Sequence, residues 1–267
     1  MDGDLERLAL EIARCPIIDA VLRGEPSPCR EVVGFQKRNA ADRWVAEPWS
    51  GHLDIAPILF VSSNPSSGNP DEHPVAGDLT ASSTDNAILN TFDKAFEPGP
   101  WFGIHDGTHL RAPDGTPGKY ISYWGSCKSR ASELVGRPAR PGLDYALTEV
   151  VHCGSQHEIG VWPAASVCVP RYLERILIRS PAAVVVVVGS VARGITRTLV
   201  PALAGDSPYV GPVIWAGRNR HVLFVPHPNA RGVPKGIAAF LGAAADHALS
   251  SIRAALPTDL PGRPPSV

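Results

Sequence analysis

The sequence predicts an α/β fold in which a mainly parallel sheet lies between two layers of helices, a three-layer α/β/α sandwich. Three short, continuous apolar runs carry this prediction: ILFVS at 58–62, AAVVVVVG at 182–189 and HVLFVP at 221–226. Such runs are typical of strands that are buried on both faces. Amphipathic segments of helical period separate them along the chain, which is the pattern of a parallel sheet covered by helices.

The first half of the chain alternates short regular elements with long irregular stretches. Residues 15–52 are irregular and punctuated by proline, and residues 66–118 are rich in Gly, Pro, Asp and Ser. A long excursion of this kind in a compact domain is often functional. The regular elements expected here are a helix over 4–14, a strand over 58–62, a helix over 85–96, a helix over 120–136 and a strand over 145–151.

The second half alternates helices and strands more regularly. Apolar residues at 169, 172, 173, 176 and 177 form a stripe of helical spacing over 169–180. The remaining elements are expected as a strand over 182–189, a helix over 190–200, a short strand over 213–216, a strand over 221–226 and a helix over 237–252.

Composition narrows the functional classes. The 267 residues are 44% hydrophobic, which suits one domain over 1–255, followed by a proline-rich tail over 256–267. The net charge of -1 excludes a strongly cationic surface, so any contact with nucleic acid must be a local patch. No apolar run is long enough for a membrane span, and the acidic N-terminus does not look like a signal peptide. We therefore expect a cytoplasmic protein.

Polar segments follow three of the predicted strands. They are SSN at 62–64, EVVHC at 149–153 and PHPNARG at 226–232. Ligands of open parallel sheets bind outside the carboxyl ends of the strands. If these strands are neighbours, the three segments converge on one cleft.

These segments resemble motifs of the uracil-DNA glycosylase superfamily. SSNPS at 62–66 is similar to the Gly-x-Asn-Pro turn of the first motif, with serine at the glycine, and HPNARG at 227–232 is similar to the His-Pro-Ser motif. The segment 146–192 resembles the iron–sulfur branch, in which one Cys follows a strand and a second Cys opens a helix that leads into an apolar strand. The resemblance covers residues 58 to 240 and implies a central, mainly parallel four-stranded sheet, a DNA partner and a monomer.

The resemblance assigns Asn64 and His227 to catalysis. Cleavage of an N-glycosidic bond builds positive charge on the sugar and negative charge on the departing base. Asn64 would hold the attacking water, and His227 would donate a hydrogen bond to the base O2 as it gains charge. Without the resemblance, Asn64-Pro65 reads as a turn initiator and His227-Pro228 as the end of a strand.

Glu149 departs from the family pattern. Uracil readers of the iron–sulfur branch carry an Asn at this place, whose amide matches uracil N3–H and O4. An ionised carboxylate only accepts hydrogen bonds, so it disfavours uracil O4 and favours the amino group of a cytosine-type base. A protonated Glu149 would serve either base, and Glu149 could also point elsewhere. The favoured target is a modified cytosine, damaged or phage-type, in which case the protein would act in antiviral defence.

Other contacts to DNA are expected from the same resemblance, because a base in a duplex must be flipped out to be reached. Arg231 would fill the gap or bind a phosphate, and Lys235 and the start of the 237–252 helix would bind phosphate. Ser66 and Ser67 would bind phosphate after the first motif. One of three aromatic residues, Phe92, Trp101 or Phe102, would stack on the flipped base, although each could equally pack in the core.

The cysteines suggest an iron–sulfur site. An odd count of five argues against a disulfide framework. Cys153 and Cys168 match the late pair of cluster ligands in the iron–sulfur branch, but the early Cys-x-x-Cys pair is missing. A four-iron four-sulfur cluster held by Cys15, Cys29, Cys153 and Cys168 would leave Cys127 as a core thiol. The alternative is a set of ordinary buried thiols.

The sequence thus favours a monofunctional DNA glycosylase that excises a modified pyrimidine. An ordinary uracil-DNA glycosylase of base-excision repair and a non-catalytic DNA-binding member of the superfamily are the alternatives. The chain has no Gly-x-Ser-x-Gly elbow and no phosphate-binding Gly-x-x-x-x-Gly-Lys loop, so an unrelated hydrolase or nucleotide-binding enzyme is disfavoured. No sequence cluster of His and acidic residues stands out as a metal site.

Overall fold

The central sheet holds five strands. In the computed structural model, which describes residues 1–36, 43–66, 79–80, 82–99, 103–112 and 114–257, the strand order is β5-β1-β6-β8-β7. The strands are β5 (Tyr145–Glu149), β1 (Ile58–Ser62), β6 (Val184–Val188), β8 (Arg218–Val225) and β7 (Tyr209–Trp215). The first four run parallel and β7 runs antiparallel to β8.

The sheet is therefore one strand larger than the four-stranded sheet that was expected. The short predicted strand at 213–216 is the end of β7, which pairs with β8 along its length. Ala216 and Gly217, both with positive φ (52° and 75°), form the two-residue turn between these strands. A turn of this kind favours a tight hairpin, which explains the antiparallel edge strand.

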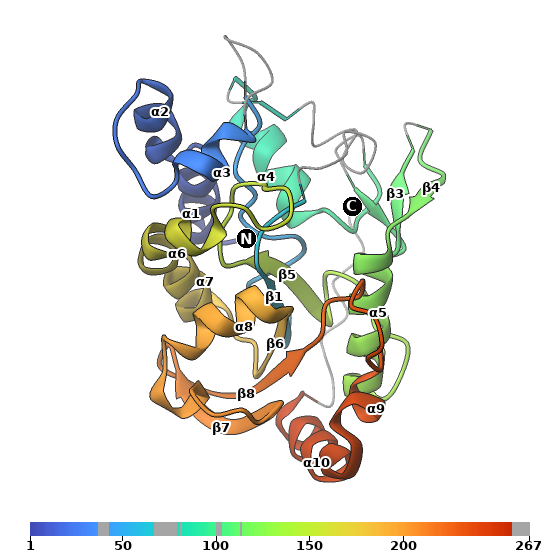
Figure 1. Cartoon of the computed structure of the whole chain (residues 1–267). Helices are drawn as coiled ribbons and strands as arrows, with labels where there is room; N and C mark the ends of the chain where they lie inside the picture. The colour runs from blue at the N-terminus through green and yellow to red at the C-terminus, as the bar shows by residue number, and fades with distance from the viewer. Residues whose placement is uncertain (37–42, 67–78, 81, 100–102, 113, 258–267) are drawn as a thin grey trace.

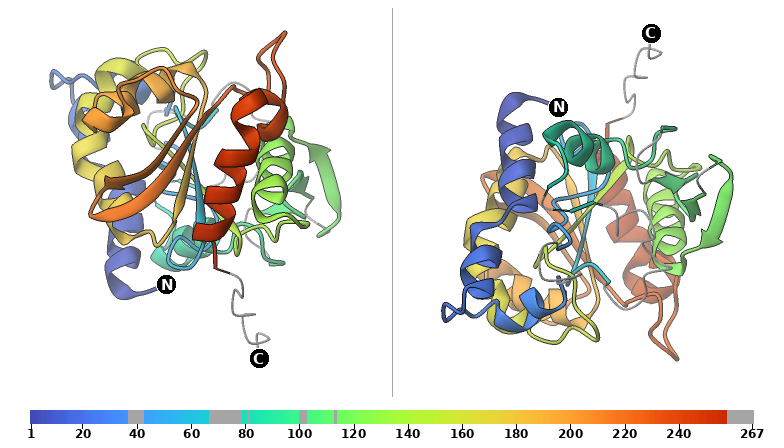
Figure 2. Two further views of the ribbon diagram at one scale, coloured as in Figure 1. Left: turned by 90° about the horizontal axis from the view of Figure 1, so that it is seen from below. Right: turned by 90° about the horizontal axis from the view of Figure 1, so that it is seen from above.

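Helices cover both faces of the sheet, as Figure 1 and the two views of Figure 2 show. One layer holds α1 (Gly3–Ala13), α6 (Val161–Cys168), α7 (Glu174–Arg179) and α8 (Ser190–Arg197). The other holds α5 (Ser122–Val135), α9 (Ile237–Leu241) and α10 (Ala245–Ala255). No helix in the described part of the chain is both long and apolar enough to cross a membrane.

Two hydrophobic cores follow from the alternation of side chains along the strands. Leu59 and Val61 point to the core beneath α1, α6 and α7, whereas Ile58 and Phe60 point to the core beneath α5, α9 and α10. Successive side chains of a strand face opposite sides of a sheet. A strand that is apolar at every position, such as the five valines of β6, therefore contributes to both cores.

Two predicted helices have different bounds in the structure. The helix predicted over 169–180 begins earlier, because α6 continues through a π-helical turn (Val169–Leu173) into α7. The helix predicted over 237–252 is interrupted at Gly242, whose φ is 55°. A short 3-10 turn (Gly242–Ala244) separates α9 from α10 there.

The long irregular stretches contain short elements that the sequence did not reveal. Within 15–52 lie α2 (Pro16–Leu22) and α3 (Arg30–Gly34). The region before α5 holds α4 (Asp85–Asp93), which lies within the helix predicted over 85–96. It also holds an unpredicted three-stranded sheet of β2 (Ile104–His105), β3 (His109–Arg111) and β4 (Pro117–Tyr120). Each unpredicted element is too short for a clear periodic signal, since periodicity needs a longer window.

The strand register brings polar segments together at one edge of the sheet. Ser62 at the end of β1 is the partner of Glu149 at the end of β5, and Val188 of β6 is the partner of Val225 of β8. The carboxyl ends of four parallel strands therefore lie along one edge. The residues that follow them are Ser63, Val150, Gly189 and Pro226.

Candidate functional site

Asn64 follows β1 and is held by backbone carbonyl groups. Its Nδ2 donates to the carbonyl oxygens of Pro65 (2.6 Å) and Ser155 (3.2 Å). Both amide hydrogens are used in this way, so Oδ1 remains as a hydrogen-bond acceptor. Asn64 is partly buried, and its fixed orientation suits an acceptor that must hold a water molecule in one place.

The segments after β1 and β5 lock together behind Asn64. Ser155 N–H donates to Pro65 O at 3.1 Å, and Ser66 forms a parallel bridge with Ser155. Val150 and Val151 donate to the carbonyls of Ser62 and Ser63. The first and second polar segments of the sequence are therefore in direct contact, as the strand-end argument predicts.

His227 follows β8 with one ring nitrogen already engaged. Its Nδ1 accepts a hydrogen bond from Asn229 N–H at 3.2 Å, so the neutral imidazole carries its proton on Nε2. One face of the ring stacks on Tyr123, with centroids 6.0 Å apart and planes 21° from parallel, while the rest of the ring is exposed. Burial lowers the pKa of His227, and Arg130 and Lys235 lower it further, against the opposing charge of Glu158. The lowered pKa favours the neutral form of His227, whose Nε2–H can donate a hydrogen bond.

Tyr123 connects His227 to the ends of β1 and β5. Its side chain is close enough to Ser62, Cys127 and Glu149 for each to affect its pKa, which burial raises well above its usual range. The hydroxyl group is buried and has no hydrogen-bond partner among the described residues. Sequence reasoning missed Tyr123, and its only signal was an aromatic residue at the start of the helix predicted over 120–136.

Glu149 carries a carboxyl group with little support from the protein. Within the described chain its one hydrogen bond is from Ser62 Oγ, at a distance of 3.5 Å. Burial raises the pKa of Glu149 well above its usual range, and the negative charge of Glu47 raises it further. The raised pKa favours the protonated form of Glu149, which offers one donor and one acceptor.

Glu47 lies beside Glu149 and was not anticipated from the sequence. Its backbone N–H donates to His152 O at 2.9 Å, and its carbonyl accepts from His152 Nδ1 at 2.8 Å. Thr148 Oγ1 donates to Pro48 O at 2.7 Å, so this segment runs along the outer edge of β5 past Glu149. Burial raises the pKa of Glu47 to about 7.

Arg130 of α5 fixes both ends of the segment that carries His227. Its side chain is only 1% exposed. Nη2 donates to Pro226 O at 2.8 Å, and Nε donates to Lys235 O at 3.1 Å. Nη1 is buried without a partner in the described chain. Arg130 therefore holds the loop and places a positive charge near His227.

The expected phosphate contacts differ in their surroundings. Arg231, Lys235 and Ser66 are exposed, and Lys235 Nζ donates to the carbonyl of Ala230. At the start of the helix after Lys235, where a phosphate contact was expected, Glu133 Oε2 accepts a hydrogen bond from Ala238 N–H at 3.1 Å. A carboxylate at that terminus repels an anion.

Of the three aromatic residues expected at the base, the structure describes Phe92 alone. Phe92 is 5% exposed and packs in a separate core cluster with Ala13, Val45, Leu79 and Ile88, so it has a packing role. Trp101 and Phe102 lie outside the described residues, as does Ser67. Among the described residues, Tyr123 is an aromatic residue that lies beside His227, Ser62 and Glu149.

Four cysteines gather on one side of the sheet. Cys15, Cys29, Cys153 and Cys168 are buried in the core beneath α1 and α6, whereas Cys127 lies in the opposite core. Cys168 donates a hydrogen bond to Cys29, which lowers the pKa of Cys29. Burial raises the pKa of Cys153, and Cys15 and Cys29 raise it further. These four cysteines are therefore neighbours in one core, whereas Cys127 lies in the other.

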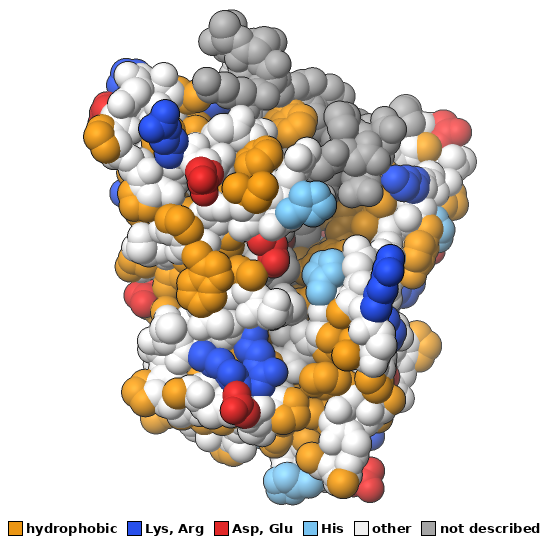
Figure 3. All heavy atoms as spheres, viewed as in Figure 1, with side chains coloured by type: hydrophobic (Ala, Val, Ile, Leu, Met, Phe, Trp, Pro, Cys, Tyr) orange, Lys and Arg blue, Asp and Glu red, His pale blue; other side chains and the backbone are white. Residues whose placement is uncertain are grey.

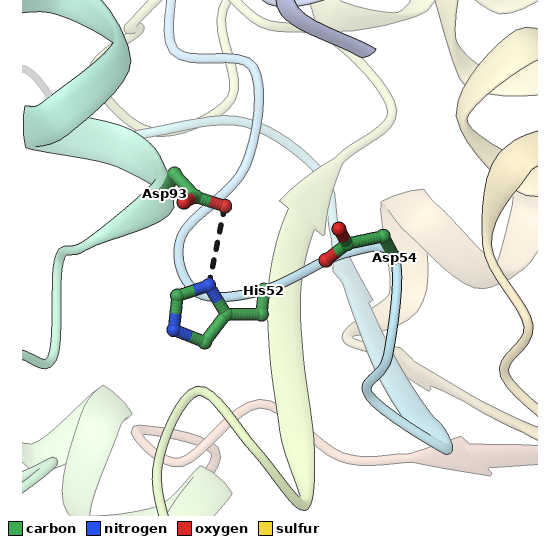
Figure 4. A group of neighbouring side chains, drawn as sticks. All are labelled: His52, Asp54 and Asp93. Carbon is green, nitrogen blue, oxygen red and sulfur yellow. Dashed lines mark hydrogen bonds and ion pairs between the residues drawn. The ribbon is translucent and has the colours of Figure 1, made fainter. Parts of the chain in front are cut away.

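A second group of metal-ligand types lies before β1. His52, Asp54 and Asp93 offer atoms that all lie within 4.8 Å of one another. Figure 4 shows His52 Nδ1 directed at Asp93, at a distance of 3.2 Å. His52 Nε2 contacts Glu97 at 2.8 Å, so both ring nitrogens face carboxylates. The group precedes β1 and lies at the opposite end of the sheet from Asn64.

His227 is exposed, and Asn64 and Glu149 are partly exposed, so solvent reaches these three residues. The face in Figure 3 is hollowed near its centre, with histidine side chains on either side of the hollow and an acidic side chain at its edge.

No protein-family model matches the chain, and a search of curated proteins finds no relative of it. The proposal of a function therefore depends on the geometry of the site and on the motifs of the sequence.

Proposed function

We propose that the protein is a monofunctional DNA glycosylase that flips a nucleotide out of DNA and hydrolyses its N-glycosidic bond. The observation that carries this proposal is the chain of contacts at the carboxyl edge of the sheet. Glu149 is hydrogen-bonded to Ser62, Tyr123 lies near both of them, and His227 stacks on Tyr123. Asn64 follows Ser62 in the chain after β1. All of these residues except Tyr123 lie at or just after the ends of strands. Asn64 suits the attacking water, Glu149 the hydrogen-bonding edge of the base, and His227 the base O2.

The proposed reaction needs no strong base. As the bond between C1′ and the base nitrogen lengthens, the sugar becomes cationic and the base gains negative charge. Asn64 Oδ1 holds the water that adds to C1′, and the proton that water loses passes to solvent. His227 donates from Nε2 to the base O2 and stabilises the departing anion. A neutral His227 that is fixed by Asn229 can do this without first rearranging.

Protonated Glu149 sets the class of base. It can donate to N3 of a cytosine-type base while it accepts from the amino group. It can also accept from N3–H of uracil while it donates to O4, so uracil stays the alternative target. Excision of unmodified cytosine would destroy the host genome, and a modified cytosine is therefore the favoured substrate.

The four gathered cysteines would hold a four-iron four-sulfur cluster. Their thiolates would supply its ligands, and the cluster would tie α2 and α3, which lie next to Cys15 and Cys29, to the segment after β5. Its proposed role is structural.

Single-turnover assays test the proposed function. Duplexes that contain uracil, cytosine, 5-hydroxymethylcytosine or glucosylated 5-hydroxymethylcytosine are incubated with excess protein, and released base is measured. We expect release of a modified cytosine, with strand breakage only after alkali treatment. Release of no base would overturn the glycosylase, and release of uracil alone would overturn the modified-cytosine target.

A further inference from the structure

The imidazole ring of His52 lies between two carboxylate groups. Its Nε2 is 2.8 Å from Glu97 Oε1, and its Nδ1 is 3.2 Å from Asp93 Oδ1. A neutral imidazole has one N–H, so it can donate to only one of these oxygens. The other nitrogen then directs a lone pair at a carboxylate oxygen, and a contact of that kind is favourable only with a proton or a metal cation between the two atoms.

The contact between His52 Nδ1 and Asp93 is the one that calls for a cation. The shorter contact assigns the N–H to Nε2, which donates to Glu97. The side chains of His52 and Asp93 are 7% and 8% exposed, so water does little to separate their charges. Asp93 is also the last residue of α4, whose last turn has no basic residue. The carbonyl groups at this end of the helix add negative charge beside the carboxylate.

Asp54 approaches the same place from the segment before β1. His52, Asp54 and Asp93 each offer an atom within 4.8 Å of the other two, and Figure 4 shows Asp93 entering from the end of α4. Asp54 also contacts the amino group of Met1 at 3.6 Å, which is longer than a hydrogen bond. Its side chain is 31% exposed, so it has room to turn towards an ion that enters from solvent.

The geometry and chemistry of these atoms suit a divalent ion of the first transition row. Bonds of about 2.0–2.2 Å to nitrogen and oxygen place neighbouring ligands roughly 3.0–3.4 Å apart. The 3.2 Å between His52 Nδ1 and Asp93 Oδ1 lies within that range. An imidazole with two carboxylates suits Mn²⁺ or Zn²⁺, whereas soft ions select thiolates.

We propose that His52, Asp54 and Asp93 bind a divalent metal ion, Mn²⁺ or Zn²⁺. Glu97 accepts the hydrogen bond from Nε2 and so keeps Nδ1 directed at the ion, as carboxylates commonly do for metal-bound histidines. The ion joins the end of α4 to the segment that leads into β1. The site lies away from Asn64, so its role is structural and the inference does not rest on the proposed function.

Titration of the protein with Mn²⁺ tests the inference. The protein is freed of metal with EDTA, and unbound Mn²⁺ is measured by electron paramagnetic resonance. Mn²⁺ is the probe because it prefers oxygen and nitrogen ligands to the thiolates of the cysteines. We expect one bound ion per chain, with the Kd raised about 100-fold in Asp54→Asn and Asp93→Asn and about 10-fold in Glu97→Gln. Glu25→Gln removes a surface carboxylate and should keep the wild-type Kd.

No binding by the wild type at about 1 mM Mn²⁺, or a Kd that is the same in Asp54→Asn and Asp93→Asn, would overturn the inference. Either result would indicate a protonated His52 that bridges two carboxylates without a metal. If Asp93→Asn does not fold, Asp54→Asn decides, because Asp54 is partly exposed. As a second measurement, Mn²⁺ at about 100 times its Kd should raise the wild-type Tm by roughly 5 °C and leave that of Asp54→Asn nearly unchanged.

Discussion

Replacement of Arg130 by methionine tests how the loop that carries His227 is held. Two hydrogen bonds from the buried guanidinium group, to Pro226 O and Lys235 O, are lost. Hydrogen bonds from charged groups contribute about 1.5–3 kcal/mol each. The desolvation cost of the buried charge offsets part of this sum, so we expect the free energy of unfolding to fall by about 2 kcal/mol.

The same substitution has an effect on His227 that stability does not report. Arg130 lowers the pKa of His227, so its removal raises that pKa towards the usual value. An NMR titration of His227 measures this shift, and denaturant unfolding measures the stability. Arg130→Lys is the control, because it keeps the charge but cannot reach both carbonyls: the rate of base release should fall while the pKa of His227 stays near the wild-type value. An unchanged His227 pKa in Arg130→Met, together with wild-type stability, would refute the reasoning.

Three other predictions address the water, the cysteines and the Glu47 carboxyl group. Asn64→Ala should lower the single-turnover rate by about 100-fold, with the Kd for DNA unchanged, because it removes only the group that positions water; an unchanged rate would exclude this role. Cys153→Ser should abolish bound iron and brown colour after anaerobic purification, whereas Cys127→Ser, in the opposite core, should keep both; equal iron in the two variants would contradict the assigned ligands. Burial raises the pKa of Glu47 to about 7, so the folded state keeps a proton that the unfolded state loses, and stability should fall as pH rises from about 4.5 to 7, by at most about 3 kcal/mol. Urea unfolding at several pH values measures this decline, and Glu47→Gln should remove it. His152 makes the opposite contribution, but it does so in both proteins. An identical pH dependence of the wild type and the variant would show that Glu47 does not titrate as described.

The sheet was predictable because its central strands consist almost entirely of apolar residues. The five valines of β6 and the apolar run of β1 are buried on both faces, which leaves one plausible environment for them. The edge strand β7 was predicted only in part, because most of its residues are only partly buried and its sequence lacks a long continuous apolar run. The break at Gly242 was missed because glycine within a helical pattern is often tolerated.

The candidate site was predictable where residues follow strand ends and unpredictable where they approach from elsewhere. Asn64, Glu149 and His227 are located by the strands that precede them. Tyr123 and Glu47 reach the same site from a helix and from an irregular segment. Their positions depend on tertiary contacts, such as the pairing of Glu47 with His152, which have no local sequence pattern.

The most direct test of the account is a crystal structure of the protein bound to a duplex whose target nucleotide, a 2′-fluorinated 5-hydroxymethylcytidine, resists hydrolysis. We predict that the base leaves the helix and enters the hollow, with O2 at His227 Nε2, its amino edge at Glu149 and a water between Asn64 Oδ1 and C1′. A base that remains stacked in the duplex, or that binds away from these three side chains, would contradict the account.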